Sequence, residues 1–120
     1  MTTEEQMTFD FAEINRSKSF DDYQDFAETT AIYPEDKALE YLALGLTSEA
    51  GEVAGKVKKL VRDGEMSVED LAKELGDVVW YVAQLCTELD LYFSEVMGLN
   101  VEKLSDRLVR GKIGGSGDNR

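Results

Sequence analysis

The sequence contains no histidine, one cysteine and one proline in 120 residues. Zinc sites usually draw on histidine or on several cysteines, and di-iron helical bundles use Glu-x-x-His pairs, so both kinds of metal centre are disfavoured. The lone Cys86 excludes a disulfide bond within the chain and fits a reducing compartment. Any bound metal is therefore expected to be a hard ion with oxygen ligands, namely magnesium, manganese or calcium.

Long apolar runs and basic residues are also scarce. No stretch approaches the ~20 consecutive apolar residues that a membrane span needs, and the acidic first thirty residues do not resemble a secretory signal peptide. The 13 lysines and arginines are outnumbered by 25 aspartates and glutamates, which gives a formal net charge of −12. Because nucleic-acid polymers bind to basic surfaces, we predict a cytoplasmic protein with neither a polymer nor a membrane as partner. A small phosphate ligand is compatible with this charge if a cation or a few clustered basic residues offset it.

The apolar residues that are present follow helical spacing, and strand-like alternation is nowhere sustained. The hydrophobic fraction of 42% in a chain of this length predicts one globular domain. Helices are predicted from about Ser19 to before Pro34, from Pro34 to about Arg62, from Ser67 to about Glu88 and from about Leu91 to Arg110.

Local signals set these boundaries. Ser19 and Ser67 can cap the helices that follow them, and Gly64 is a helix stop signal. The third predicted helix is apolar on two sides, so the pattern predicts an all-α fold, a four-to-five-helix bundle completed by oligomerisation. We divide the chain into an N-terminal extension, a helical domain and a glycine-rich tail or flexible loop, at residues 1–18, 19–110 and 111–120.

Two pairs of acids stand out on the second and third predicted helices. Glu49 and Glu52 lie three residues apart, as do Glu74 and Asp77, so each pair projects from one helix face. If the two helices pack antiparallel, four carboxylates converge and repel one another unless a cation lies between them. Magnesium suits this role because it accepts carboxylate ligands and keeps positions for water or phosphate oxygens. The alternative is that such pairs are ordinary charges on solvated helix faces, which are common in an acidic chain.

The residues around these acids resemble the MazG family of nucleotide pyrophosphohydrolases. The signature of that family is Glu-x-x-Glu, a spacer, and Glu-x-x-Asp, which this chain carries within residues 44–59 and 73–78. The likeness extends to residues 23–27, to the pattern Asn-x-x-Lys-Leu-x-x-Arg at 100–107 and to the glycine-rich end, so it covers about residues 20 to 120.

This resemblance implies an all-α fold shared with the all-α dUTPases, acting as a homo-oligomer, a dimer or tetramer with sites near the interface. It also implies hydrolysis of nucleoside triphosphates, deoxynucleotides included, at the α–β bond to monophosphate and pyrophosphate. By similarity Mg²⁺, with Mn²⁺ as a substitute, would be held by Glu49, Glu52, Glu74 and Asp77. Substrate binding would fall to Asn100, Lys103 and Arg107, the last two contacting phosphate.

The chemistry of the residues supports this interpretation. A carboxylate not fully committed to the metal can take a proton from the attacking water, and Glu49 and Glu52 are equal candidates for that catalytic role. Lys56 and Lys59 continue the same helix stripe and could offset charge on the leaving pyrophosphate. Ordinary salt bridges are an equally weighted alternative for these lysines.

Aromatic residues on the first predicted helix offer a site for a base. Tyr23, with Phe20 and Phe26, could stack on a base while Gln24 hydrogen-bonds its edge, although such a stripe is more often core. Trp80 is predicted to lie at a subunit interface rather than under a base. Two other classes of function stay open, namely a non-catalytic nucleotide-binding or regulatory module with a structural metal ion, and a purely structural oligomeric bundle.

Overall fold

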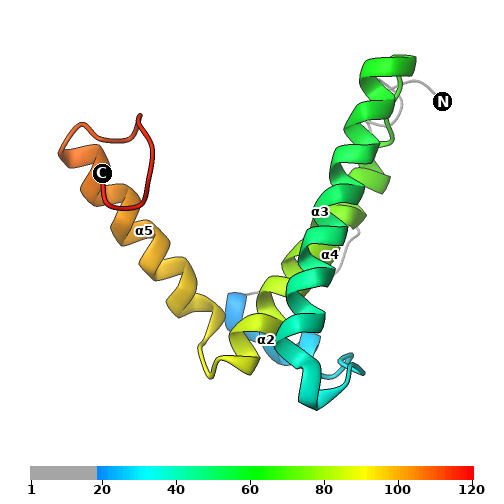
Figure 1. The fold of residues 1–120 in the computed structure, drawn as a ribbon, viewed down its shortest axis with the longest axis horizontal. Coiled ribbons are helices and arrows are strands. Elements are labelled where there is room, and N and C mark those ends of the chain that lie inside the picture. Colours follow the sequence, from blue (N-terminus) through cyan, green and yellow to red (C-terminus); the bar gives the residue numbers. More distant parts are fainter. Residues whose placement is uncertain (1–18) are drawn as a thin grey trace.

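The computed structural model describes residues 19–120. Its elements are helix α2 (Phe20–Glu28), the 3₁₀ turn η2 (Glu35–Lys37) and helices α3 (Ala38–Asp63), α4 (Val68–Glu88) and α5 (Phe93–Val109) (Figure 1). These described residues contain helices and no strand, which confirms the all-α prediction. The N-terminal extension predicted for residues 1–18 lies outside the described part of the chain.

The helix ends follow the local sequence signals. The Ser19 hydroxyl accepts a hydrogen bond from the Asp22 N–H at 3.0 Å, and Ser67 caps α4 in the same way through the Asp70 N–H at 3.1 Å. Gly64 ends α3 in the left-handed region, with φ of 76°. A side chain would strain this conformation, which is why glycine is favoured at the position.

The long helices α3 and α4 form an antiparallel hairpin, and α2 packs against the C-terminal part of this arm. Helix α5 contacts α2 and α4 but does not contact α3, as far as the described residues go. The hairpin and α5 therefore form the two arms of a V (Figure 1). Residues 19–120 do not close a helical bundle by themselves.

A small core lies where α2, α4 and α5 meet, built on Ala27, Ala83 and Phe93. Gln24 joins the three elements. Its side-chain Nε2 donates to the Thr87 hydroxyl at 3.1 Å and to the Leu91 carbonyl at 2.9 Å, while its Oε1 accepts from the Phe93 N–H at 2.8 Å. These bonds occupy both ends of the buried amide, so Gln24 fixes the angle at which α5 leaves the core.

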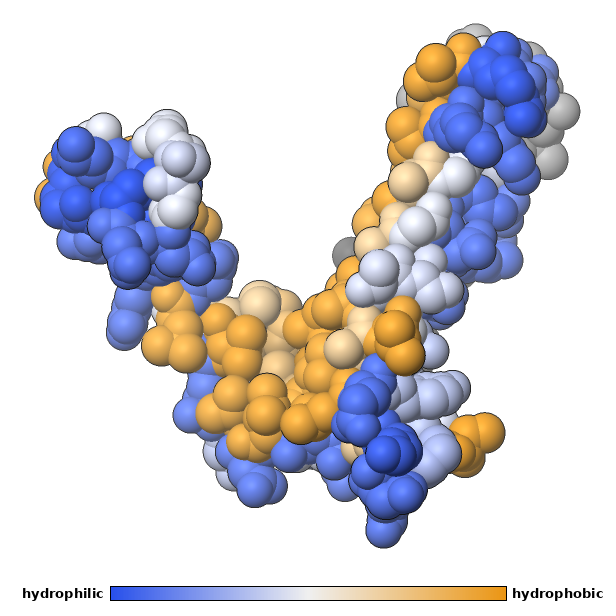
Figure 2. Space-filling view, in the orientation of Figure 1, coloured by the Kyte–Doolittle hydropathy of each residue, from blue (hydrophilic) through white to orange (hydrophobic). Residues whose placement is uncertain are grey.

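Apolar surface continues across the base of the V and along the hairpin arm (Figure 2). On α5 the residues Val101, Leu104 and Leu108 repeat at seam spacing, yet they are 62%, 42% and 71% exposed. Exposed apolar patches of this extent mark interaction surfaces in soluble proteins. None of the described helices is both long and apolar enough to cross a membrane.

Candidate metal and phosphate site

Three of the four acids singled out in the sequence meet between α3 and α4. Glu49 from α3 and Glu74 and Asp77 from α4 each place a carboxylate oxygen within 4.8 Å of the others. Glu49 and Glu74 are half-buried and Asp77 is exposed. Glu52 is exposed and is not one of these three.

Burial and the neighbouring acids hinder the ionisation of Glu49. The pKa of Glu49 is raised, first by burial, then by the charge of Asp77 and by a hydrogen bond shared with Glu74. The charge of Glu52 adds to this effect, so the fourth acid contributes to the field at the cluster from outside it. Clustered carboxylates that resist ionisation are suited to binding a hard cation, which would remove the repulsion.

A pocket of about 310 Å³ opens beside the cluster, lined by Thr30, Glu49, Asp77, Trp80 and Tyr81. The Trp80 indole N–H donates to the Thr30 hydroxyl at 2.8 Å, and its ring meets the Tyr81 ring edge to face at 5.0 Å. The pKa of the Tyr81 phenol is raised, mainly by burial, with further contributions from Tyr41, Glu49 and Asp77. The pocket thus joins carboxylates on one side to aromatic rings on the other.

The close approach of Tyr81 to α3 depends on Gly45. A Cβ atom at this position would overlap the Tyr81 ring. Sequence reasoning missed Thr30 and Tyr81 and placed Trp80 at an interface. Trp80 and Tyr81 lie three and four residues after Asp77 on the same helix, and this spacing is the signal that could have associated them with the acids.

The residues predicted to contact the base lie around α2. Tyr23 packs edge-on against Phe93 at 6.5 Å, and its pKa is raised by burial and by the charge of Asp77. It therefore lies within electrostatic reach of the cluster. Phe20 and Phe26 are 52% and 65% exposed, so the stripe is not simply core. Gln24 is buried and its amide is committed to the bonds described above, so we assign it a structural role in place of base recognition.

Lys56 and Lys59 line a different pocket, at the closed end of the hairpin. Acids and polar groups on both sides of the α3–α4 turn share this pocket, among them Asp63, Ser67 and Asp70. The lysines are thus set apart from the pocket that holds Glu49 and Asp77.

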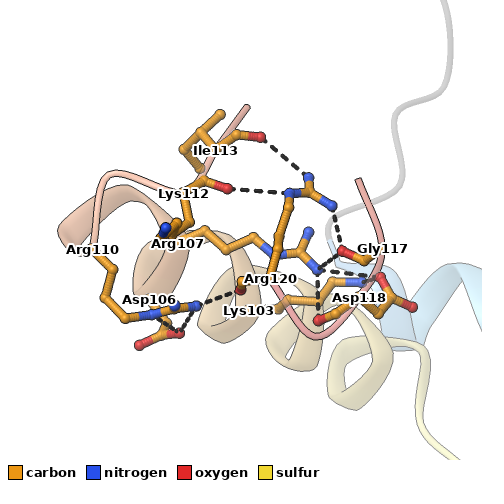
Figure 3. Close-up of polar contacts among 9 residues, drawn as sticks. All are labelled: Lys103, Asp106, Arg107, Arg110, Lys112, Ile113, Gly117, Asp118 and Arg120. Atoms are coloured by element: carbon orange, nitrogen blue, oxygen red, sulfur yellow. Dashed lines mark hydrogen bonds and ion pairs between the residues drawn. The ribbon is translucent and has the colours of Figure 1, made fainter. Parts of the chain in front are cut away.

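The basic residues of α5 are engaged by the C-terminal loop (Figure 3). Asp118 Oδ1 lies 3.2 Å from Lys103 Nζ and 3.3 Å from Arg107 Nη2, which also donates to the carbonyls of Gly117 and Asp118. Arg120 donates to the carbonyls of Lys112 and Gly117. The segment expected to be a tail or flexible loop therefore folds back onto α5.

Within one chain these basic residues do not join the acid cluster. Asn100 and Lys103 are exposed on α5, whereas Arg107 is 4% exposed under the loop. Because α5 makes no contact with α3 over residues 19–120, the predicted phosphate-binding residues and Glu49 belong to different arms of the V.

Comparison with known proteins identifies the family. The model of the MazG nucleotide pyrophosphohydrolase domain matches residues 37–109, a span that includes both acid pairs and all of α5. The Gene 37 protein of Mycobacterium phage L5 is 49% identical over 111 residues, covering 83% of this chain and 97% of that protein. No solved structure matches the chain. With the family match over more than half of its length and all four signature acids in place, the chain belongs to the MazG nucleotide pyrophosphohydrolase family.

Proposed function

We propose that this protein is a Mg²⁺-dependent hydrolase that cleaves nucleoside triphosphates, deoxynucleotides included, between the α and β phosphates, releasing monophosphate and pyrophosphate. The observation that carries this proposal is the meeting of Glu49, Glu74 and Asp77 in a chain of the MazG family. All three are oxygen donors, and the pKa of Glu49 is raised by burial and then by the neighbouring acids, so the donor set fits Mg²⁺, or Mn²⁺ as a substitute.

Each acid has a distinct role in this proposal. Glu49, Glu74 and Asp77 would hold the ion, which when bound supplies neutralisation of phosphate charge. Glu52 is exposed and outside the group of three, so its carboxylate is free to accept a proton from the attacking water. The geometry thus favours Glu52 over Glu49 as the general base, a choice that the sequence leaves open.

The aromatic pocket is the proposed site of the nucleoside. Glu49 and Asp77 line its acidic side, where the phosphates would lie, and Trp80 and Tyr81 offer ring faces and edges for the base. Tyr23 approaches the same acids from α2. Lys56 and Lys59 border a separate pocket, which weakens their assignment to the leaving pyrophosphate.

A second copy of the chain would bring α5 to the acids. Helix α5 exposes its apolar seam, and residues 103–120 carry five basic residues against two acids in an otherwise strongly acidic chain. We therefore propose a homo-oligomer, a dimer or tetramer, in which Lys103 and Arg107 of one subunit face the carboxylates of another. The loop at 111–120 would then belong to the functional unit, because it folds onto α5.

The test is release of pyrophosphate from a panel of ribo- and deoxyribonucleoside triphosphates, with Mg²⁺ and with a chelator. Equal amounts of monophosphate and pyrophosphate, formed only with Mg²⁺, would support the proposal. Orthophosphate as the first product would contradict cleavage at the α–β bond. Nucleotide binding without any turnover would favour a regulatory module in which the acids hold a structural ion.

A further inference from the structure

Lys103 and Arg107 already hold an anion, which belongs to the chain itself. The Asp118 side chain places one oxygen, Oδ1, between Lys103 Nζ at 3.2 Å and Arg107 Nη2 at 3.3 Å (Figure 3). Two cationic groups converging on a single anionic oxygen is an arrangement that proteins also use for phosphate.

In this arrangement Arg107 is held in place, whereas the Asp118 side chain is exposed. Arg107 is 4% exposed, and its Nη2 also donates to the carbonyls of Gly117 and Asp118 at 3.3 and 2.9 Å. The Asp118 side chain is 82% exposed. Main-chain oxygens thus hold Arg107 in place, and the carboxylate can leave without releasing it.

The loop likewise does not depend on this carboxylate. Arg120 donates to the carbonyls of Lys112, Ile113 and Gly117, and these bonds close the loop independently. The contacts of Asp118 Oδ1 are longer than the roughly 2.7–2.9 Å of strong charge-assisted bonds. An ion pair with so exposed a partner contributes little to stability, so it can be displaced at small cost.

We propose that Asp118 is a resident anion in a phosphate-binding site, and that the polyphosphate of the substrate displaces its carboxylate from Lys103 and Arg107. The inference rests on the proposed function for the identity of the ligand. The two basic groups depress the pKa of Asp118, so its carboxylate is ionised at neutral pH and competes as an anion. If this proposal is right, removing the Asp118 carboxylate strengthens phosphate binding. If the carboxylate instead positions Lys103 for the substrate, removing it weakens binding.

The experiment measures binding of tripolyphosphate to the full chain by calorimetry, in chelator, so that neither metal nor turnover is required. Asp118→Asn is expected to bind tripolyphosphate about two- to fivefold more tightly than the unaltered chain, the range that loss of an exposed ion pair allows. Asp106→Asn is the matched control. It makes the same change of charge at an exposed acid on α5 that pairs with Arg110 at 2.8 Å.

Weaker binding by Asp118→Asn would overturn the proposal and make Asp118 a positioning residue. An equal gain in both variants would also overturn it, since overall charge would then be the cause. Adding Lys103→Gln to Asp118→Asn should remove the gain. If the protein hydrolyses triphosphates but Asp118→Asn binds no better, this inference fails while the proposed function stands. If Asp118→Asn binds tripolyphosphate more tightly but the protein hydrolyses no triphosphate, this inference stands and the proposed function fails.

Discussion

The two arms of the molecule carry opposite charge and hold it by different means. On the hairpin, three carboxylates meet because two long helices fix the positions of Glu49, Glu74 and Asp77. On α5, the basic groups of Lys103 and Arg107 are held by a loop of main-chain carbonyls and one exposed acid. The packing of two helices is thus enough to form the acidic site, whereas the basic site also depends on the folding of the loop at 111–120.

This difference concerns how each site is prepared for a ligand. The pKa of Glu49 is raised by burial and then by the charges of the neighbouring acids, and a bound cation would offset both effects. The basic groups already share one carboxylate, that of Asp118, so an arriving phosphate must compete with it. A ligand that joins Mg²⁺ to polyphosphate satisfies both arms, and this argues for a nucleotide bound between the hairpin of one subunit and α5 of another.

The largest effect is expected on the hairpin arm. Glu52→Gln should lower kcat by about 10²- to 10⁴-fold, the usual contribution of a general base, because the amide cannot accept the proton of water. The residue is exposed, so thermal stability should stay unchanged. The matched control is Glu40→Gln, an exposed acid on the same helix that pairs with Lys37. A near-normal kcat in Glu52→Gln would contradict this role and favour Glu49 as the general base.

Mixing two inactive variants tests whether the arms of different subunits cooperate. Glu52→Gln damages the hairpin arm and Lys103→Ala damages the other arm. Co-expressed, they should regain about one quarter of wild-type activity, since about half of randomly formed dimers are mixed and each of these holds one intact site. Steady-state rates of pyrophosphate release measure the recovery. Persistent inactivity in a verified mixed dimer would show that both arms of a site come from one chain.

Metal should stabilise the hairpin arm selectively. At a hundredfold excess over its Kd, Mg²⁺ should raise the free energy of unfolding by roughly 2.7 kcal/mol, measured by urea denaturation. Asp77→Asn should lose most of this gain, yet in chelator it should be as stable as the wild type or more so, because one repelling charge is gone. Asp106→Asn, the same change on the α5 arm, should respond to Mg²⁺ as the wild type does. Full Mg²⁺ stabilisation of Asp77→Asn would remove Asp77 from the metal site.

The sequence predicted the hairpin arm well because its information is local. The cap at Ser67 and the stop at Gly64 act within one helical turn, and the structure confirms the helices that they delimit. Residue spacing also placed Glu74 and Asp77 on one face of α4, and both belong to the cluster. It could not separate Glu52 from that group, because spacing fixes an angle around a helix and not the distance to a neighbouring helix.

The α5 arm was less predictable because its contacts are distant in sequence. The direction of α5 depends on Gln24 binding Leu91 and Phe93, nearly seventy residues away. The glycines of the last ten residues suggested flexibility, but they permit a turn in which Gly117, with φ of 84°, presents its carbonyl to both Arg107 and Arg120. The glycine content indicates only that such a turn is possible. The contacts with Arg107 and Arg120 that stabilise it are visible only in the structure.

The smallest effect, and the sharpest contrast between the arms, lies in the pH dependence of the metal-free protein. The pKa of Glu49 is raised in the folded state above its ordinary 4.5, so folded Glu49 binds more protons than unfolded Glu49 between these two values. Stability in chelator should therefore decline as pH rises from about 4.5 through the folded pKa of Glu49, where the penalty becomes complete. Urea denaturation across this window should show a shallower decline in Glu49→Gln and a wild-type decline in Glu40→Gln.

With saturating Mg²⁺ the decline should reverse, because the metal binds the ionised carboxylates and its affinity grows with pH. An unchanged decline in Glu49→Gln would mean that neither burial nor the neighbouring acids hinder the ionisation of Glu49 in solution, and the distinction between a strained acidic arm and a paired basic arm would be lost.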